Sequence, residues 1–432
     1  MAAKDAPVRV ALLGAGVVGG GVARILNEKR ETYARQLGRP LVLTGALVRD
    51  AARARGELDS ALVTTDPARI LDDPSIDIVI EVLGGEQPAL DYIRHALIAG
   101  KSVVTANKEV MAKHGPGLLA LARQHNVDLL FEASVGGGIP IIAPLRRDLL
   151  ANRIIALSAI INGTTNYILT AMSREGADFA QALSQAQALG YAEANPANDV
   201  EGEDARFKLA ILASLAFRTP VRPEDIYREG ITRLTAKDFR YAAELGYAIK
   251  LLALARWQDG GIQARVHPVF IPADAPLAKV DGVLNAVEVE GDLIGRVNFQ
   301  GPGAGSFPTT SAVIADVLDA AQSIIGGRRE LYAAEEAPSR IIPMSDLRTR
   351  YYIRLTVADQ PGVLAQIAAA LGQAQISISS VLQKETHIDA QTAELVIMTH
   401  EAREASMQEA LATVGKLDAV HEISNFLRVE EQ

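Results

Sequence analysis

A strand, a glycine-rich turn and a helix follow one another without a spacer near the start of the chain. The apolar run "VRVALL" begins at residue 8, "GAGVVG" follows it directly, and helical periodicity of apolar residues extends from about Val17 to Leu37. This order is typical of the first βαβ unit of a dinucleotide-binding domain. It constrains the fold strongly, because it indicates both the kind of sheet and the position of its first crossover helix.

Further apolar β runs follow, with helical segments between several of them. We predict these strands at 41–48, 76–84, 101–107 and 127–134. Apolar strands that alternate with helices indicate a parallel sheet covered on both faces. The fold class is therefore α/β, with an N-terminal Rossmann-type domain.

The glycines of the first turn have the spacing that a bound pyrophosphate requires. Gly14 permits the tight turn, Gly16 lets the backbone approach the phosphates, and Gly19 lets helix and strand pack closely. Val17 and Val18 open the helix, whose N-terminal N–H groups favour an anion. The alternative is a glycine-rich turn in another kind of α/β protein.

The end of the second strand should carry the group that distinguishes NAD from NADP. Arg49 stands there, followed at once by Asp50, with Arg53 and Arg55 close behind. An arginine can accept the 2′-phosphate of NADP, whereas an acid favours NAD. The pattern leans toward NADP and leaves NAD open; a merely exposed charged turn is the alternative.

The remaining chain divides into further regions. Long Ala-rich helices lie between 178 and 256, strands at 262–299, and a glycine loop opens a helix at 301–325. The last part reads strand, helix, strand, strand, helix, strand, which predicts a ferredoxin-like α+β domain. The predicted regions are a dinucleotide-binding domain at 1–135 completed by about 301–325, an α+β substrate-binding, catalytic and dimerisation domain at 136–300, a linker at 326–349 and a regulatory domain at 350–432.

Composition excludes several classes of function. The chain has 432 residues, 49% of them hydrophobic, and a net charge of −9, which argues against nucleic-acid or anionic-membrane partners. It contains no cysteine, so disulfides, thiolate metal sites and cysteine nucleophiles are impossible. We find no membrane-span or signal-peptide pattern and expect a cytoplasmic protein.

Two lysines occupy positions suited to reducing a carbonyl group. Lys108 follows the fifth strand, at the carboxyl edge of the predicted sheet, where ligands of such folds bind. Asp204 and Lys208 are four residues apart and share one face of a helix that continues into apolar sequence. Burial there could lower the pKa of Lys208 and make it a proton donor. The alternatives are a surface lysine and an ordinary exposed helix pair.

Several segments together resemble the long form of homoserine dehydrogenase. They are the turn "GAGVVGGG", "TANKEVMAKHG" (105–115), "FEASVGGGIPII" (131–142), "INGTTNYIL" (161–169) and "GYAEANPANDVEGEDARFKLAIL" (190–212). The C-terminal region, with "DQPGVL" (359–364), resembles an ACT domain. The likeness covers nearly the whole chain, and the combination is far more specific than any one segment.

The resemblance implies roles for individual residues. Lys208 would donate the proton, Asp204 would hold it, and Lys108 would line the same site and contact substrate and cofactor. Glu193 and Asp199 would bind the α-ammonium group of an amino-acid substrate, and Gly163 and Thr164 would contact either its carboxylate or the nicotinamide ribose. Further cofactor contacts would come from Thr105, Gly303 and Gly305. A monovalent cation, Na⁺ or K⁺, would lie on backbone carbonyls near Glu132, Val135, Gly137 and Ile139.

Structural alternatives stand beside these roles. Thr164 or Thr165 could simply cap a helix, and the glycines after Glu132 could form an interdomain hinge. We expect residues 194–198 to form a loop, and Glu201 and Glu203 to act only as acids near a helix N-terminus.

The implied reaction is the interconversion of L-aspartate 4-semialdehyde and L-homoserine with NAD(P). A semialdehyde dehydrogenase that forms a thioester is excluded by the absence of cysteine. A binding protein that has lost its activity and an oxidoreductase that acts on sugars are competing interpretations, disfavoured by the two lysines and by the acid cluster respectively. The ACT-like region implies feedback by L-threonine in the threonine, methionine and isoleucine pathway, and a homodimer or homotetramer; the competing interpretation is dimerisation without an effector.

Overall fold

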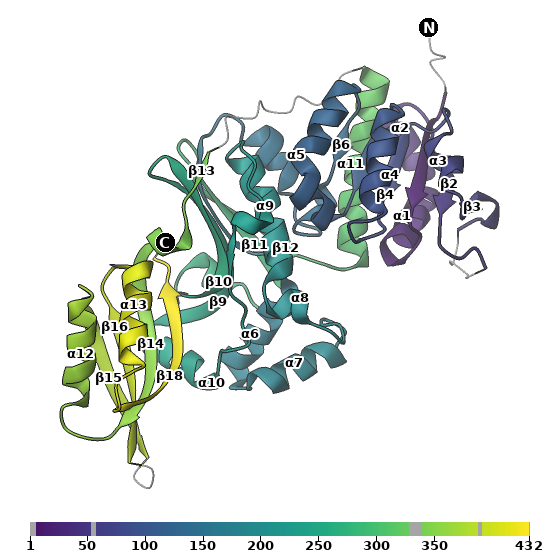
Figure 1. Ribbon diagram of the computed structural model, residues 1–432. Coiled ribbons are helices and arrows are strands. Elements are labelled where there is room, and N and C mark those ends of the chain that lie inside the picture. The colour runs from purple at the N-terminus through teal and green to yellow at the C-terminus, as the bar shows by residue number, and fades with distance from the viewer. Residues whose placement is uncertain (1–5, 53–57, 328–338, 388–390, 432) are drawn as a thin grey trace. The chain divides into compact units, whose positions relative to one another are not determined.

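The computed structural model describes residues 6–52, 58–327, 339–387 and 391–431 (Figure 1). The chain forms two compact units, each assembled from three separate segments. Unit 1 consists of Met1–Ile155, Phe207–Pro223 and Asn285–Ser339, and unit 2 consists of Ala156–Arg206, Glu224–Leu284 and Arg340–Gln432. The domain limits drawn from the sequence stay predictions.

Unit 1 contains a six-stranded parallel sheet in the order β3-β2-β1-β4-β5-β6. Its strands are β1 (Val8–Leu13), β2 (Leu41–Leu47), β3 (Val63–Thr64), β4 (Ile78–Glu81), β5 (Ser102–Thr105) and β6 (Leu129–Leu130). Every residue of β4 and β5 is buried, as expected for strands covered on both faces. The predicted Rossmann-type sheet is confirmed, and its strand order reverses between β1 and β4, where such folds bind dinucleotides.

Helices cover this sheet. They are α1 (Val17–Glu28), α2 (Arg30–Leu37), α3 (Ala68–Leu71), α4 (Ala89–Ile98), α5 (Lys108–Gln124) and α11 (Ser306–Gly326). Helix α11 comes from far along the chain, yet Val313 and Val317 share one apolar core with Leu12 and Val22. The strands β11 (Leu284–Gly291) and β12 (Gly295–Pro302) precede α11 and neighbour each other.

The helix predicted over 17–37 is two helices. It is interrupted at Lys29, which has φ −102° and ψ 15°, outside the helical geometry. Leu26 before the break and Tyr33 after it both face the core. Because apolar residues keep a helical spacing across the interruption, periodicity alone could not reveal it.

A long hairpin organises unit 2. The strands β9 (Tyr247–Gln258) and β10 (Gly261–Pro272) pair antiparallel over their whole length. Asp259 and Gly260 connect them with φ values of 50° and 73°. Two consecutive left-handed residues match the twist of the flanking strands, and Asp-Gly is a favoured sequence for such a turn.

The other elements of this unit include β7 (Ile154–Ile160), β8 (Tyr227–Arg228), α6 (Gly163–Glu175), α7 (Phe179–Ala188), α8 (Ala197–Val200) and α10 (Ala236–Glu244). The predicted loop at 194–198 is therefore partly wrong, because α8 already begins at Ala197. Helix α9 (Glu203–Ala216) begins in unit 2 and continues into unit 1.

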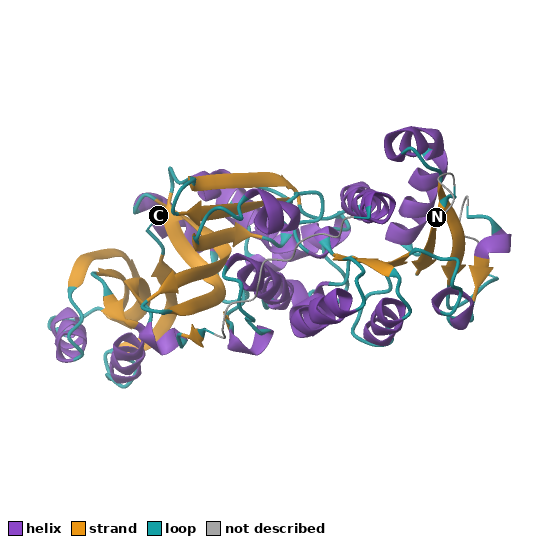
Figure 2. Ribbon diagram, turned by 90° about the horizontal axis from the view of Figure 1, so that it is seen from above, coloured by secondary structure: helices purple, strands orange, loops and turns teal. Residues whose placement is uncertain are grey.

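The C-terminal region forms the predicted βαββαβ module. Its elements are β14 (Arg348–Ala358), α12 (Val363–Gln373), β15 (Ile378–His387), β16 (Thr392–Thr399), α13 (Glu404–Val414) and β18 (Val420–Val429), with the short β17 (Ala402–Arg403) before α13. The two helices pack on one face of the antiparallel sheet, with Ile367 and Met407 in a core shared with Leu355 and Ile397 (Figures 1 and 2).

This module is joined to the rest of unit 2 through β10. Strand β18 pairs parallel with β10 at Val269 and Phe270, so one path of strands runs β7-β9-β10-β18-β14-β16-β15. The predicted linker at 326–349 also contains β13 (Arg340–Ile341), which pairs with the start of β10. Its residues 328–338 lie outside the described part of the chain.

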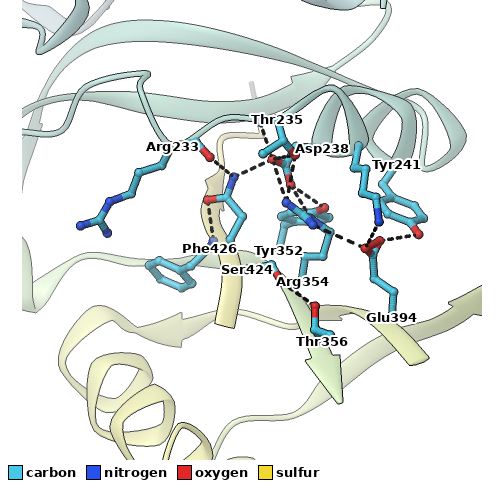
Figure 3. A network of polar contacts seen from close by, with 12 residues as sticks. Arg233, Thr235, Asp238, Tyr241, Tyr352, Arg354, Thr356, Glu394, Ser424 and Phe426 are labelled. Atoms are coloured by element: carbon cyan, nitrogen blue, oxygen red, sulfur yellow. Dashed lines mark hydrogen bonds and ion pairs between the residues drawn. The ribbon is translucent and has the colours of Figure 1, made fainter. Parts of the chain in front are cut away.

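A buried polar network lies between α10 and the module's sheet (Figure 3). Arg354 Nε is 2.8 Å from Asp238 Oδ1, and the hydroxyl of Tyr352 donates to the same oxygen. Glu394 accepts hydrogen bonds from Tyr241 and Lys237, each at 2.9 Å. Asp238 and Arg354 are 0% and 5% exposed, so their charges compensate one another inside the protein.

Among the described residues, no helix combines the length and apolar character that crossing a membrane requires.

Candidate functional site

The first glycine turn of unit 1 has the geometry expected of a dinucleotide site. Gly14 has φ 106°, and a Cβ there would lie 3.0 Å from the carbonyl oxygen of Val82. A Cβ on Gly19 would lie 2.0 Å from the carbonyl oxygen of Gly14, so neither position tolerates a side chain. By contrast, nothing lies within 4 Å of a Cβ on Gly16, and Val17 is 76% exposed. The start of α1 is therefore open to solvent, and its backbone N–H groups can bind a pyrophosphate.

The neighbouring positions differ in what they can contact. Val18 packs against the core of the sheet. Arg49 and Asp50 are exposed just beyond β2, and one carboxylate oxygen of Asp50 accepts the N–H of Ala52 at 2.9 Å. Arg53 and Arg55 lie outside the described residues.

The start of α11 adjoins the same turn. Gly305 precedes the helix with φ 120°, and Ser306 Oγ lies 3.5 Å from the carbonyl oxygen of Val17. Gly303 lies in a crowded place, since a Cβ there would be 1.9 Å from Nδ2 of Asn285. The second glycine loop therefore returns the chain to the first one.

Lys108 is the first residue of α5 and lies at the carboxyl edge of the sheet. It is half-buried, directly after β5. Asn107 caps the helix by accepting the N–H of Val110. Thr105, by contrast, is fully buried, and its hydroxyl donates at 2.6 Å to Glu81, a residue that sequence reasoning missed. The signal for Glu81 was an acid at the end of an otherwise apolar strand.

Asp204 and Lys208 occupy successive turns of α9. Asp204 is 4% exposed and Lys208 is half-buried. Phe207, beside Lys208, lies under the ammonium group of Lys113, which is 5.6 Å from its ring centre. Because Lys113 belongs to α5, the helices that carry Lys108 and Lys208 pack together within unit 1.

Asn162 brings two predicted carboxylates together in unit 2. Its Nδ2 donates to Asp199 Oδ1 at 2.6 Å and to Asp204 Oδ2 at 2.9 Å. Its Oδ1 accepts the N–H of Thr165, so Asn162 also caps α6. The alternative that Thr164 or Thr165 caps this helix is wrong, because the asparagine occupies the capping position. Thr164 donates instead to the carbonyl oxygen of Tyr191.

The remaining acids of this region are placed differently. Glu193 is exposed, and its carbonyl oxygen accepts the side-chain amide of Gln187 at 3.1 Å. Glu203 forms two ion pairs that the sequence did not indicate. Its Oε1 lies 2.6 Å from Nη2 of Arg206, and its Oε2 lies 3.1 Å from Nε of Arg228. Glu201 is half-buried and its carbonyl oxygen accepts a hydrogen bond from Arg228.

The glycine-rich segment after Glu132 folds around that carboxylate. Oε1 accepts the N–H groups of Ile141 and Ile142 at 2.6 and 2.8 Å, and Oε2 accepts that of Ala143 at 2.7 Å. Both carboxylate oxygens of Glu132 therefore already accept backbone N–H groups, so the carboxylate fixes the conformation of the segment that follows it.

Further residues of this segment are tightly packed. Val135 and Ile139 are buried, and a Cβ on Gly137 would lie 2.4 Å from the carbonyl oxygen of Gly303. Within the described residues, no three His, Asp or Glu side chains converge as they would around a transition metal.

Family comparisons account for almost the whole chain. The family model described as "Homoserine dehydrogenase, NAD binding domain" matches residues 14–132. The model described as "Homoserine dehydrogenase" matches residues 140–318. The model of the ACT domain matches residues 351–419. The homoserine dehydrogenase of Neisseria gonorrhoeae is 43% identical over 98% of this chain and 99% of its own length. That of Mycobacterium tuberculosis is 44% identical over 100% of this chain and 99% of its own.

Solved structures give the same result. A homoserine dehydrogenase from Thiobacillus denitrificans matches with a TM-score of 0.93 and 43% identity, covering 99% of both chains. A hyperthermophilic archaeal homoserine dehydrogenase in complex with NADPH matches with a TM-score of 0.62 and 30% identity, covering 73% of this chain and 98% of that one.

Proposed function

The chain belongs to the homoserine dehydrogenase family of NAD(P)-dependent oxidoreductases that act on CH–OH groups, and from this premise we propose which residues perform the reaction. The substrate pair is L-homoserine and L-aspartate 4-semialdehyde. The nicotinamide, when bound, accepts or supplies the hydride. The protein must bind the amino acid, stabilise the charge on the reacting oxygen and move one proton.

Lys208 is the proposed proton donor to the alkoxide that forms when the aldehyde is reduced. Asp204, one turn earlier on α9, holds the ammonium group of Lys208 in place. Lys108 provides a second cation for the same oxygen and contacts the cofactor. Support comes from the contact between Lys113 of α5 and the ring of Phe207 of α9, since Phe207 and Lys208 belong to the same unit as α5.

The observation that carries this proposal is the bridge formed by Asn162. Its amide fixes Asp199 and Asp204 at 2.6 and 2.9 Å, and Lys208 follows on the same helix as Asp204. Two carboxylates that are held together by one amide suit a substrate that brings its own α-ammonium group. Asp199 is the proposed ammonium ligand, and Gly163 and Thr164 lie at the start of the adjacent helix. The role of Glu193 rests on the family resemblance alone.

NADP is the cofactor that we favour. Arg49 is exposed beyond β2, where its guanidinium group can bind the 2′-phosphate of NADP. The archaeal relative that was solved with NADPH points the same way. The pyrophosphate would lie on Gly14, Gly16 and Gly19, next to the start of α11.

The proposed accessory features follow from the family. A Na⁺ or K⁺ ion bound by carbonyls near Glu132 would rigidify the segment beside Gly303. L-Threonine would bind the ACT module as a feedback effector of the threonine, methionine and isoleucine pathway, and the protein would act as a homodimer or homotetramer. Gly362, with φ 90°, leaves backbone N–H groups at the start of α12 suited to an effector carboxylate. Threonine titration of the reaction rate tests the effector.

Initial rates of homoserine oxidation with NAD⁺ and NADP⁺ test the main proposal. Lys208→Ala should lower kcat by about 10²-fold or more, the usual contribution of a proton donor. Lys416→Ala, which removes an exposed lysine, is the matched control and should keep native rates. Absence of homoserine-dependent reduction by the native protein with either cofactor would refute the function. A Lys208→Ala variant with native kcat would refute only the role of that lysine.

A further inference from the structure

A buried carboxylate lies at the end of β4 without a role in the proposed reaction. Glu81 is 0% exposed, and burial raises the pKa of its carboxyl group. Oε2 accepts the hydroxyl of Thr105 at 2.6 Å, and Oε1 accepts the N–H of Leu83 at 2.8 Å. Its two oxygens therefore connect the ends of two neighbouring strands, β4 and β5.

The hydrogen bonds continue from Thr105 to the start of α5. The N–H of Asn107 donates to Thr105 Oγ1 at 3.0 Å. The side chain of Asn107 forms two further hydrogen bonds. Its Nδ2 donates to the carbonyl oxygen of Gly85 at 2.7 Å, and its Oδ1 accepts the N–H of Val110 at 3.1 Å. The chain from Glu81 thus reaches the first turn of α5 and returns to the loop after β4.

Both ends of this chain of hydrogen bonds face the cofactor edge of the sheet. Lys108 follows Asn107 directly and is the first residue of the helix that Asn107 caps. The loop after β4 contains Val82, whose carbonyl oxygen is the neighbour that excludes a side chain at Gly14. A single buried carboxylate is therefore bonded to both turns that border the proposed site.

We propose that Glu81 is a positioning residue that holds Lys108 in its catalytic orientation through Thr105 and Asn107. The inference rests on the role proposed for Lys108. Glu81 has no other task in this arrangement: it is sealed from solvent and cannot touch the substrate. Misplacing a catalytic group by about 1 Å can cost as much as 10²-fold in rate, so such support has a measurable effect.

Glu81→Gln tests the proposal with little change in volume. The amide oxygen can still accept the N–H of Leu83, but the amide nitrogen cannot accept the hydroxyl proton of Thr105. We expect kcat to fall about tenfold, while the dissociation constant for NADPH, measured by fluorescence, changes less than threefold. Ser102→Ala is the control, because it removes another buried hydroxyl of β5, one that accepts the N–H of Asp128. It should leave kcat within twofold of native.

A double-mutant cycle with Lys108→Ala separates positioning from general damage. If Glu81 acts through Lys108, the tenfold effect of Glu81→Gln shrinks to less than twofold once Lys108 is alanine. Equal losses in both backgrounds, or a native kcat for Glu81→Gln, would overturn the positioning role. A native kcat for Lys108→Ala would instead overturn the role of Lys108 itself.

Thr105→Val is the second variant, since it removes the hydroxyl that donates to Glu81 whatever the protonation state of that carboxyl group. It should reproduce the loss in kcat and its disappearance in the Lys108→Ala background. A lower melting temperature with unchanged kcat for both Glu81→Gln and Thr105→Val would show a structural role only, and would refute the inference.

Discussion

At the scale of single residues, charge in this protein is organised by neutral hydrogen-bonding groups. Asn162 joins Asp199 and Asp204, although these are 37 and 42 positions away. Thr105 links Glu81 to Asn107 in the same manner. A pattern of acids and lysines in the sequence indicated where chemistry could occur. It could not indicate the amides and hydroxyls that fix those charges, because their partners are distant in the chain.

The cofactor preference is a prediction at this scale. Arg49→Ala should raise KM for NADP⁺ about tenfold and leave KM for NAD⁺ within twofold, because only NADP carries the phosphate that a guanidinium binds. Steady-state kinetics with both cofactors measure this. Arg30→Ala, which removes another exposed arginine of unit 1, should change neither value. A similar rise for both cofactors would contradict a contact with the 2′-phosphate.

At the scale of elements, the sequence located most strands of the Rossmann sheet and of the C-terminal module, but the strand predicted over 127–134 is only Leu129–Leu130 and is followed by a 3-10 helix at Glu132–Ser134. Their apolar runs are continuous or alternating, and each is bounded by turn residues. The prediction failed where tertiary packing decides, as at 247–256, which is predicted among the Ala-rich helices and belongs to the strand β9. The interruption at Lys29 leaves the apolar spacing intact, and the short α8 follows Pro196, which favours a helix start as well as a loop.

Helix α11 provides a pH-dependent prediction. It carries Asp316 into the core, where the carboxyl group accepts the N–H of Glu132 and burial raises its pKa well above the usual value. Because the pKa of Asp316 is higher in the folded protein, this carboxyl group loses its proton at a lower pH in the unfolded chain than in the folded one. The stability from this group is therefore present below pH of about 4 and is lost as the pH rises toward the folded-state pKa.

Asp316→Asn removes the cost of ionising this buried position and keeps an acceptor for Glu132. We expect the variant to have a higher melting temperature than the native protein at pH 8 and a smaller difference at pH 4. Thermal unfolding at both pH values measures this. A difference that grows toward low pH would contradict the assignment. Asp148→Asn, at an exposed carboxyl group of the same unit, is the control.

At the scale of the whole molecule, the ACT module is an integral part of unit 2. Its strand β18 pairs with β10, and Asp238 and Tyr241 of α10 are buried against its sheet (Figure 3). A chain truncated near Arg340 would expose both side chains and the paired edge of β10. Effector experiments are therefore informative only on the full chain.

The buried network predicts a large loss of stability when it is broken. Arg354→Met leaves Asp238 without its cation and should lower the free energy of unfolding by about 3–5 kcal/mol. Arg24→Met breaks an ion pair with Glu28 whose side chains are 37% and 51% exposed, and should cost less than about 1 kcal/mol. Urea unfolding compares the two variants. Equal losses would mean that the network contributes no more than a surface pair.

The topology of β10 also has a consequence for synthesis. Its hairpin partner β9 precedes it directly, so the pair can form as soon as residue 272 has left the ribosome. The partner of Val269 and Phe270 is β18, at the other end of the remaining chain. Until β18 has been made, the backbone of Val269 and Phe270 is an open sheet edge that another nascent chain could occupy. Strand β18 is thus needed to cover these two residues of β10 during synthesis, long after the hairpin itself can form.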